Sequence, residues 1–243
     1  MISTYQTWLN NDREWIGAYC SRTRKSSLTK VVPLTLLLSA LVLGGMGILS
    51  GGGVAALLTG IIGGLVFGLI VCGIYLLILM TNLNPARYTR KLEQSVRELS
   101  MDETEQEQLG AEMLASLESD KGVLSYQMVG PNSNGTPARV ILTPHYILQE
   151  GSTPYAVLIR LSDIAEIRTG SERKLATTHG GSSKTHHYFT LYSIGFYRKD
   201  RFERGLEGND LPDYAMGFFQ KELRDDVVNR IQNNGLQVTV SEG

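Results

Sequence analysis

The sequence predicts an α+β membrane protein, in which a two-helix transmembrane hairpin is joined to an antiparallel β domain that a C-terminal helix closes. Three observations predict this fold. No Asp, Glu, Lys, Arg or His occurs in the fifty residues from Val31 to Met80. Three consecutive glycines, from Gly51 to Gly53, divide this block. Short segments rich in β-branched and aromatic residues follow Gly122, and turn residues separate them.

The uncharged block is too long for a single membrane crossing. A single helix over it would be about 75 Å long at ~1.5 Å per residue, whereas the hydrocarbon core is ~30 Å thick and needs ~20 residues. Two helices, at about 31–49 and 54–80, fit when the glycines form the turn between them. The competing interpretation, a cleavable signal peptide, would require a shorter apolar core near the start of the chain.

Basic residues flank the apolar block on both sides, and the turn between the two helices carries no charge. Positively charged flanks stay on the cytoplasmic side of a membrane. The sequence therefore predicts a multi-pass protein of the cell membrane, with both termini cytoplasmic and the lipid bilayer as a partner. The flanking residues are Arg22, Arg24, Lys25 and Lys30 before the block, and Arg87, Arg90, Lys91 and Arg97 after it.

Small residues recur at every fourth position of the second apolar helix, at Ala56, Gly60, Gly64 and Gly68. Small residues allow two helix backbones to approach closely, and dispersion contacts then hold the helices together in lipid. We expect these four residues to pack against the first helix of the same chain. A homo-oligomer built through the same stripe is the alternative. No charged residue within the block marks an ion path.

The first thirty residues, 1–30, carry aromatic and apolar side chains near helical spacing. Tryptophan and tyrosine favour the headgroup level of a membrane. We therefore expect an amphipathic helix on the membrane surface, with Trp8 and Trp15 as membrane contacts. In the alternative interpretation, these two tryptophans dock on the soluble domain.

A helical linker is predicted over residues 81–120. Pro85 suits the first turn of a helix. Ser100 and Glu103 have the spacing of a capping box, which predicts a second helix over about 101–118 with Ser100 as its N-cap.

The remaining residues, 121–243, are predicted to form a cytoplasmic β domain. Its segment ARVILTPHYILQEGSTPYAVLIRLSDIAEIRTG contains a strand that ends at Leu142 and Thr143, and a corner at Leu161, Asp163 and Ile164. This pattern resembles bacterial PH-like (GRAM-like) domains attached to membrane helices, over about residues 122–234. The resemblance implies an antiparallel sheet or barrel closed by a helix, and it does not imply phosphoinositide binding. The closing helix is predicted to begin at Tyr214 and to end at Gly235.

Residues with catalytic or metal-binding chemistry are few. His179, His186 and His187 surround a predicted hairpin turn, but a zinc site needs three or four ligands, and an exposed polar tip is the expected structure. Lys184 in the same tip is a further candidate for a membrane-surface contact. No GxSxG, HExxH or GxxxxGK[ST] motif occurs. We expect no enzyme activity, no metal and no cofactor, and the net charge of -1 gives no reason to expect nucleic acid.

These observations favour a non-catalytic membrane protein that displays an interaction module, or adaptor, at the inner leaflet. Its expected partner is another protein at the cytoplasmic face. The first alternative is an oligomeric transport- or pore-related subunit assembled through the glycine stripe. The second is an enzyme whose site has no recognisable motif.

Overall fold

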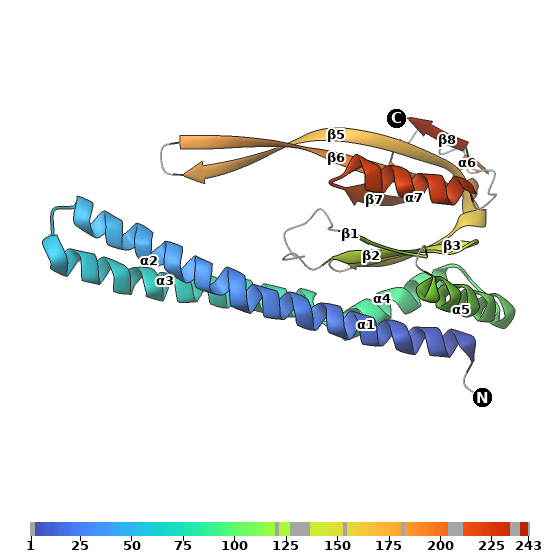
Figure 1. Cartoon of the computed structure of the whole chain (residues 1–243), viewed down its shortest axis with the longest axis horizontal. Coiled ribbons are helices and arrows are strands. Elements are labelled where there is room, and N and C mark those ends of the chain that lie inside the picture. The colour runs from blue at the N-terminus through green and yellow to red at the C-terminus, as the bar shows by residue number, and fades with distance from the viewer. Residues whose placement is uncertain are drawn as a thin grey trace.

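In the computed structural model of the chain, two long helical arms run side by side, and a β domain lies along one end of them (Figure 1). The structure describes residues 3–119, 122–126, 137–152, 155–180, 183–203, 211–233 and 239–242. The helical elements are α1 (Thr4–Ser26), a π-helical turn η1 (Ser27–Val31), α2 (Val32–Leu49), α3 (Gly53–Asn82), α4 (Pro85–Glu98), α5 (Glu103–Glu118), a 3-10 turn η2 (Leu161–Asp163), α6 (Lys199–Glu203) and α7 (Lys221–Asn233). The strands are β1 (Val123–Tyr126), β2 (Ala138–Leu142), β3 (Tyr146–Ser152), β4 (Tyr155–Arg160), β5 (Ile164–Gly180), β6 (Ser183–Arg198), β7 (Tyr214–Phe218) and β8 (Thr239–Glu242).

The N-terminal arm is one helix of 46 residues, because α1 continues through η1 into α2. Within η1 the backbone N–H of Val32 bonds to the carbonyl of Ser27, five residues earlier. Pro33 follows directly and has no N–H to donate, so the helical ladder loosens just before it. The N-terminal segment therefore extends the first apolar helix and does not turn away to lie beside it. The helix expected over residues 1–30 is therefore continuous with the first apolar helix.

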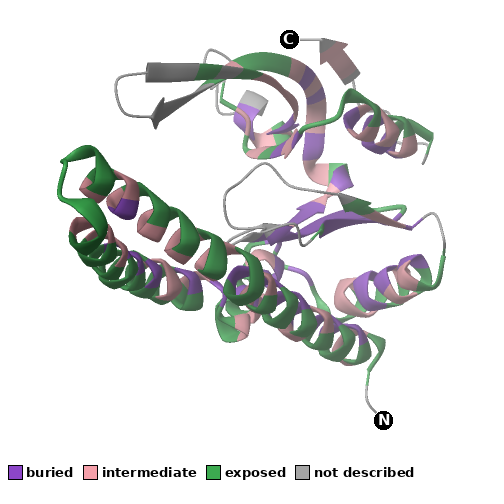
Figure 2. Cartoon of the chain, turned by 60° about the vertical axis from the view of Figure 1, so that its left-hand side comes forward, coloured by how far each residue is buried: buried purple, intermediate pink, exposed green. Residues whose placement is uncertain are grey.

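Two long apolar helices are confirmed, with α2 and α3 as their apolar parts. Each arm is long and apolar enough to cross a membrane. A turn of Ser50 to Gly52 joins α2 and α3, and Gly51 and Gly53 have φ angles of 77° and 64° that only glycine adopts readily. Most side chains along α2 and α3 are exposed or half-buried, as Figure 2 shows.

The β domain consists of two four-stranded sheets. The first has the order β1-β2-β3-β4 and is antiparallel throughout. The second has the order β7-β6-β5-β8, in which β5 pairs in parallel with β8 and the other neighbours are antiparallel. The turn η2 connects β4 to β5, so the predicted corner at Leu161 to Ile164 is the point where the chain passes from one sheet to the other.

The first sheet is covered on both faces. On its inner face, apolar residues of the two sheets and of α7 form one core cluster, which includes Val140, Ile159, Phe196 and Ile231. On its outer face, α1, α4 and α5 supply the apolar cover, in a second cluster that includes Trp8, Leu92 and Met113. A third cluster joins α1 to the end of α3 and to α4: Ile16, Tyr19, Cys20, Leu79, Leu83 and Tyr88.

Two local predictions need correction. The segment from Tyr214 to Phe218 is strand β7, which pairs with β6, and the C-terminal helix begins only at Lys221. The N-cap of α5 is Asp102, whose carboxylate accepts a hydrogen bond from the N–H of Glu105. Ser100, the predicted cap, has a φ angle of 50° and lies in the turn before that helix.

Candidate functional site

The small residues predicted to pack helices lie against α2 of the same chain. A Cβ on Gly64 would collide with the backbone of Ser39, and a Cβ on Gly60 would collide with the backbone of Leu43. A Cβ on Gly68 would lie 2.7 Å from the hydroxyl oxygen of Ser39. These glycines allow two backbones to come together where any larger residue would separate them.

Two other glycines of α3 lie outside this contact. No atom lies within 4 Å of the Cβ position of Gly63 or Gly73. Ala56 is half-buried, and its carbonyl oxygen occupies the space that a Cβ on Gly47 would need. The α2–α3 contact therefore uses one face of α3 and leaves Gly63 and Gly73 on another.

The predicted membrane contact at Trp8 needs correction, because this side chain has no exposed surface. Trp8 packs in the cluster between α1 and the outer face of the first sheet. That face carries apolar side chains such as Ile141 and Leu148, which need a cover, and a tryptophan buries ~150–250 Å² when it provides one. Trp8 therefore docks on the β domain, as the alternative interpretation of the sequence stated. The side chain of Lys184 lies outside the described residues.

Trp15 is half-buried and belongs to a charged junction between α1 and the first sheet. The guanidinium carbon of Arg139 lies 3.9 Å from the centre of the Trp15 ring. The ring of Tyr19 stacks on the same tryptophan, with centroids 5.4 Å apart. A cation over an aromatic face is attractive, and more so where water is excluded.

The centre of this junction is a buried cluster of one cation and two acids. Arg139 of β2 bonds to Asp12 of α1 at 2.6 Å and to Glu150 of β3 at 2.7 Å. Arg139 and Glu150 are directly opposite each other in the sheet. The exposed fractions of Asp12, Arg139 and Glu150 are 2%, 5% and 0%. Charges buried this deeply require partners.

Two acids and one arginine leave one negative charge in excess unless a proton is bound. Burial raises the pKa of Glu150 well above its usual range, and the negative charge of Asp12 raises it further against the attraction of Arg139. Burial also raises the pKa of Asp12, although Arg139 opposes this. One oxygen of Glu150 accepts no hydrogen bond from the described residues. A proton bound by Glu150 would make the junction neutral.

Two further hydrogen bonds link α1 to other parts of the structure. The Tyr19 hydroxyl donates to the carbonyl of Gly151, whose φ angle of 88° turns the end of β3 toward α1. Arg24 donates to the carbonyl of Leu83 at the C-terminal end of α3. Helix α1 is thus bonded both to the β domain and to the second arm.

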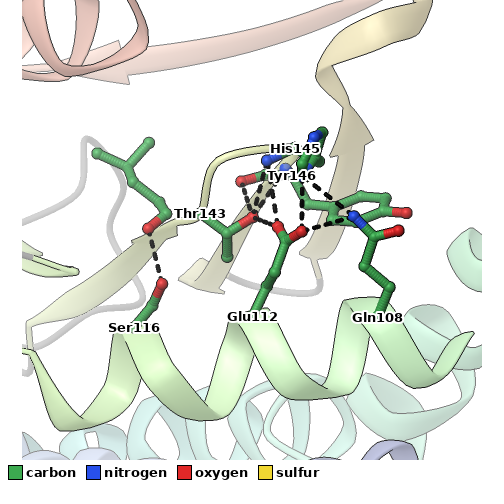
Figure 3. A network of polar contacts seen from close by, with 7 residues as sticks. Gln108, Glu112, Ser116, Thr143, His145 and Tyr146 are labelled. Carbon is green, nitrogen blue, oxygen red and sulfur yellow. Dashed lines mark hydrogen bonds and ion pairs between the residues drawn. The ribbon is translucent and has the colours of Figure 1, made fainter. Parts of the chain in front are cut away.

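A second polar network joins α5 to the turn between β2 and β3 (Figure 3). Glu112 accepts hydrogen bonds from Gln108 and Thr143, each at 2.8 Å, and from the backbone N–H of His145 at 3.2 Å. The Nδ1 atom of His145 lies 2.6 Å from the same carboxylate. Burial alone would raise the pKa of Glu112, but the hydrogen bonds from Gln108, Thr143 and His145 outweigh it and lower that pKa.

The carboxylate–imidazole pair in this network resembles part of a hydrolase triad only in composition. Ser116, one turn further along α5, donates to the carbonyl of Leu142 at 3.0 Å and not to His145 (Figure 3). Thr143 donates to Glu112 and accepts the N–H of Tyr146 at 2.8 Å, so its hydroxyl closes the turn. The arrangement holds a turn on a helix and presents no hydroxyl to the imidazole as a nucleophile.

A hollow of about 470 Å³ lies on the second sheet, over β5, β6 and β7. Gly170 and Gly195 line it, and Arg168, Tyr197 and Pro212 border it. The Arg168 guanidinium lies 4.4 Å from the centre of the Tyr197 ring and bonds to Glu166 at 2.9 Å. The hollow is therefore largely apolar with one paired charge at its border.

Sequence reasoning did not single out Asp12, Arg139, Glu150 or Glu112. Asp12 and Arg139 are 127 positions apart in the chain, so no local motif joins them. One feature of the sequence could have indicated this junction. Arg139 is a charged residue inside the otherwise apolar strand ARVIL. Of the three predicted tip histidines, the side chain of His186 is described and exposed, and those of His179 and His187 lie outside the described residues.

Within the described ranges, no group of three or more His, Cys, Asp or Glu side chains is placed to hold a metal ion. Comparisons with protein-family models, with curated proteins and with solved structures give no match for this chain.

Proposed function

We propose that this protein is a non-catalytic integral membrane protein that crosses the cell membrane twice and holds a PH-like interaction module at the cytoplasmic face. One observation carries the proposal. Among the described residues, all but four of the exposed large hydrophobic side chains lie between Leu28 and Met80. A continuous apolar surface of this kind marks a membrane or a protein interface, and the uncharged length of α2 and α3 favours the membrane.

The charges that flank the hairpin support the orientation. Four basic residues precede the block and four follow it, while the α2–α3 turn has none. By the positive-inside rule, the two ends of the hairpin are cytoplasmic. The β domain, which is bonded to α1, is then held close to the inner leaflet.

The strand order supports a PH-like module. Strands β1 to β4 form an antiparallel four-stranded sheet, the next three strands, β5 to β7, are neighbours in a second sheet, and one amphipathic helix follows. Strand β8, which pairs in parallel with β5 after that helix, departs from the expected pattern.

The polar clusters support a non-catalytic function. Asp12 and Glu150 are buried and both bond to the buried Arg139, and the Glu112 network closes a turn. The charged residue beside the hollow, Arg168, is paired with Glu166. Each cluster therefore has a structural explanation.

The oligomeric pore alternative receives no separate support from the helix contacts. The faces of Gly60, Gly64 and Gly68 are already covered by α2 of the same chain. A second copy could use this stripe only if it displaced α2.

We place the contact with the partner protein at the hollow over β5 to β7. Glycines along its floor let an incoming side chain approach the strands closely, and a paired arginine beside a tyrosine is typical of protein interfaces. A photoreactive amino acid at Ala215, which is exposed at the hollow, should form an adduct in native membranes. The adduct should disappear in a Gly195→Leu variant, and the same group at Gln232 on α7 should form none.

Membrane topology is the decisive test of the proposal. Single cysteines at Ser50 in the turn and at Gln232 on α7 would be labelled with a membrane-impermeant thiol reagent. In right-side-out vesicles we expect labelling at residue 50 alone, and in inverted vesicles at residue 232 alone. Labelling of residue 232 from outside, or extraction of the protein by alkaline wash without detergent, would refute the proposal.

A further inference from the structure

Strands β5 and β6 continue as a two-stranded ribbon far beyond the sheet to which they belong. They pair from Ile164 and Arg198 to Gly180 and Ser183. On one side, β8 accompanies β5 only as far as Thr169, and on the other, β7 accompanies β6 only from Tyr192. In the described chain, no third strand supports the ribbon beyond these points. An isolated two-stranded hairpin is marginally stable in water, so this ribbon requires a surface to lie on.

The ribbon carries an exposed apolar pair. Leu175 and Tyr188 are directly opposite each other on the two strands. Their exposed fractions are 51% and 58%. The guanidinium carbon of Arg173 lies 4.3 Å from the centre of the Tyr188 ring, and Lys174 is the next residue along β5.

The charge of the ribbon is positive. From Arg173 to Tyr192 the sequence contains Arg173, Lys174 and Lys184 but no Asp or Glu. The acid that precedes this stretch, Glu172, pairs with Lys174 at 2.5 Å. In a chain whose net charge is -1, this is a local basic surface that complements an anionic one.

The ribbon and the α2–α3 hairpin leave the rest of the molecule on the same side. Figure 1 shows strands β5 and β6 running toward the side on which the α2–α3 turn lies. If α2 and α3 span the bilayer, the ribbon is directed toward the cytoplasmic leaflet. A tyrosine and a leucine with an arginine on the same face suit that interface, because the ring and the alkyl chains enter the headgroup layer while the cation meets lipid phosphates.

We propose that the β5–β6 ribbon is a second membrane contact, in which Leu175 and Tyr188 enter the headgroup layer of an anionic leaflet and Arg173, which lies over the Tyr188 ring on the same face, binds its phosphates. This inference rests on the proposed membrane anchorage. The α2–α3 hairpin inserts the protein, and the ribbon fixes the distance and the rotation of the β domain above the leaflet.

Environment-sensitive fluorophores at three positions test the inference. Cys20 and Cys72, both buried, are replaced by alanine, and single cysteines are placed at Leu175, at the exposed Leu65 of α3, and at the exposed Gln232 of α7. The labelled full-length protein is reconstituted into vesicles of phosphatidylcholine with phosphatidylglycerol, and into vesicles of phosphatidylcholine alone. Nitroxide groups on the lipids, shallow or deep, act as quenchers.

We expect the residue 65 fluorophore to be quenched by deep nitroxides in both kinds of vesicle, and the residue 232 fluorophore by neither. The residue 175 fluorophore should be quenched by shallow nitroxides, severalfold more strongly in the anionic vesicles. An Arg173→Gln protein should lose that difference.

Two outcomes would overturn different claims. If residue 175 behaves like residue 232 while residue 65 is quenched, the ribbon contact is wrong and the membrane anchorage stands. If residue 65 is not quenched, the anchorage itself is wrong. Blue-shifted emission at residue 175 with added RNA, but not with anionic lipid, would assign the ribbon to nucleic acid and would also refute the inference.

Discussion

Asp12 in the N-terminal helix and Arg139 in strand β2 form a buried ion pair of 2.6 Å, although 127 positions separate them in the chain. Helix α1 is continuous with the apolar helix α2. The pair therefore connects the β domain directly to the proposed membrane anchor, without an intervening flexible linker.

Removal of the arginine should loosen this connection. In Arg139→Ala, Asp12 and Glu150 would lose the buried cation between them, and breaking a buried pair costs about 3–5 kcal/mol. We expect faster hydrogen exchange in α1 and β3 and a lower free energy of unfolding in detergent. Arg13→Ala is the matched control, because Arg13 bonds to Glu93 with side chains 43% and 40% exposed, and exposed pairs contribute about 0–1 kcal/mol. Equal effects of the two substitutions would contradict this prediction.

The raised pKa of Glu150 predicts a dependence of stability on pH. A carboxyl whose pKa is raised in the folded state, as for Glu150, stabilises the protein fully below its unfolded pKa. That stability is lost as the pH rises toward the folded pKa. Glu150→Gln keeps a neutral donor toward Asp12 and should be less sensitive to rising pH than the wild type. Asp12, whose pKa is also raised, adds a slope of the same sign to both proteins. Unfolding midpoints measured from acidic to alkaline pH would check this, and parallel curves would argue against the bound proton.

Substitutions at two neighbouring glycines of α3 should affect the packing of the helix hairpin differently. Gly64→Leu places a side chain where the backbone of Ser39 lies, whereas Gly63→Leu places one where no atom is found within 4 Å. We expect Gly64→Leu to separate α2 from α3 and Gly63→Leu to be tolerated. Disulfide formation between cysteines introduced into the two helices, assayed in membranes, provides the measurement. If both variants cross-link like the parent protein, the close packing is not needed.

The α5 network should respond to acid. The pKa of Glu112 is lowered by its hydrogen-bond donors, so the stability that it contributes is present above its unfolded pKa and is lost as the pH falls through the folded value. Glu112→Ala would leave the Thr143 hydroxyl and the His145 N–H without this acceptor, at a cost of about 1–3 kcal/mol. Exchange protection of the β2–β3 turn is the readout. Glu118→Ala, exposed on the same helix, should leave that protection unchanged.

The sequence was sufficient to predict the elements that depend on composition or on local spacing. The uncharged block and its glycine turn predicted the bounds of α2 and α3 to within a few residues. The length of an apolar run corresponds to the length of the helix that it forms. Leu92, Val96 and Leu99 show the helical period expected of a buried face, and all three are buried. Pro85, which was predicted for the first turn of a helix, is the first residue of α4.

The errors arose where tertiary contacts decide the structure. The segment YAMGF has residues that suit a helix or a strand, and its pairing with β6 makes it β7. Trp8 suits either a membrane surface or a protein core, and the apolar outer face of the first sheet decides in favour of the core. The Asp12–Arg139–Glu150 junction joins three separate elements, so no spacing along the chain could reveal it.

The unbroken N-terminal helix also has a mechanical consequence. Its 46 residues make a lever about 69 Å long at ~1.5 Å per residue. A tilt of about 10° at the membrane end would swing the far end sideways by about 12 Å over that length. If α2 crosses the membrane as proposed, a change in bilayer thickness or in the helix tilt would also move the β domain, because this domain is bonded to α1.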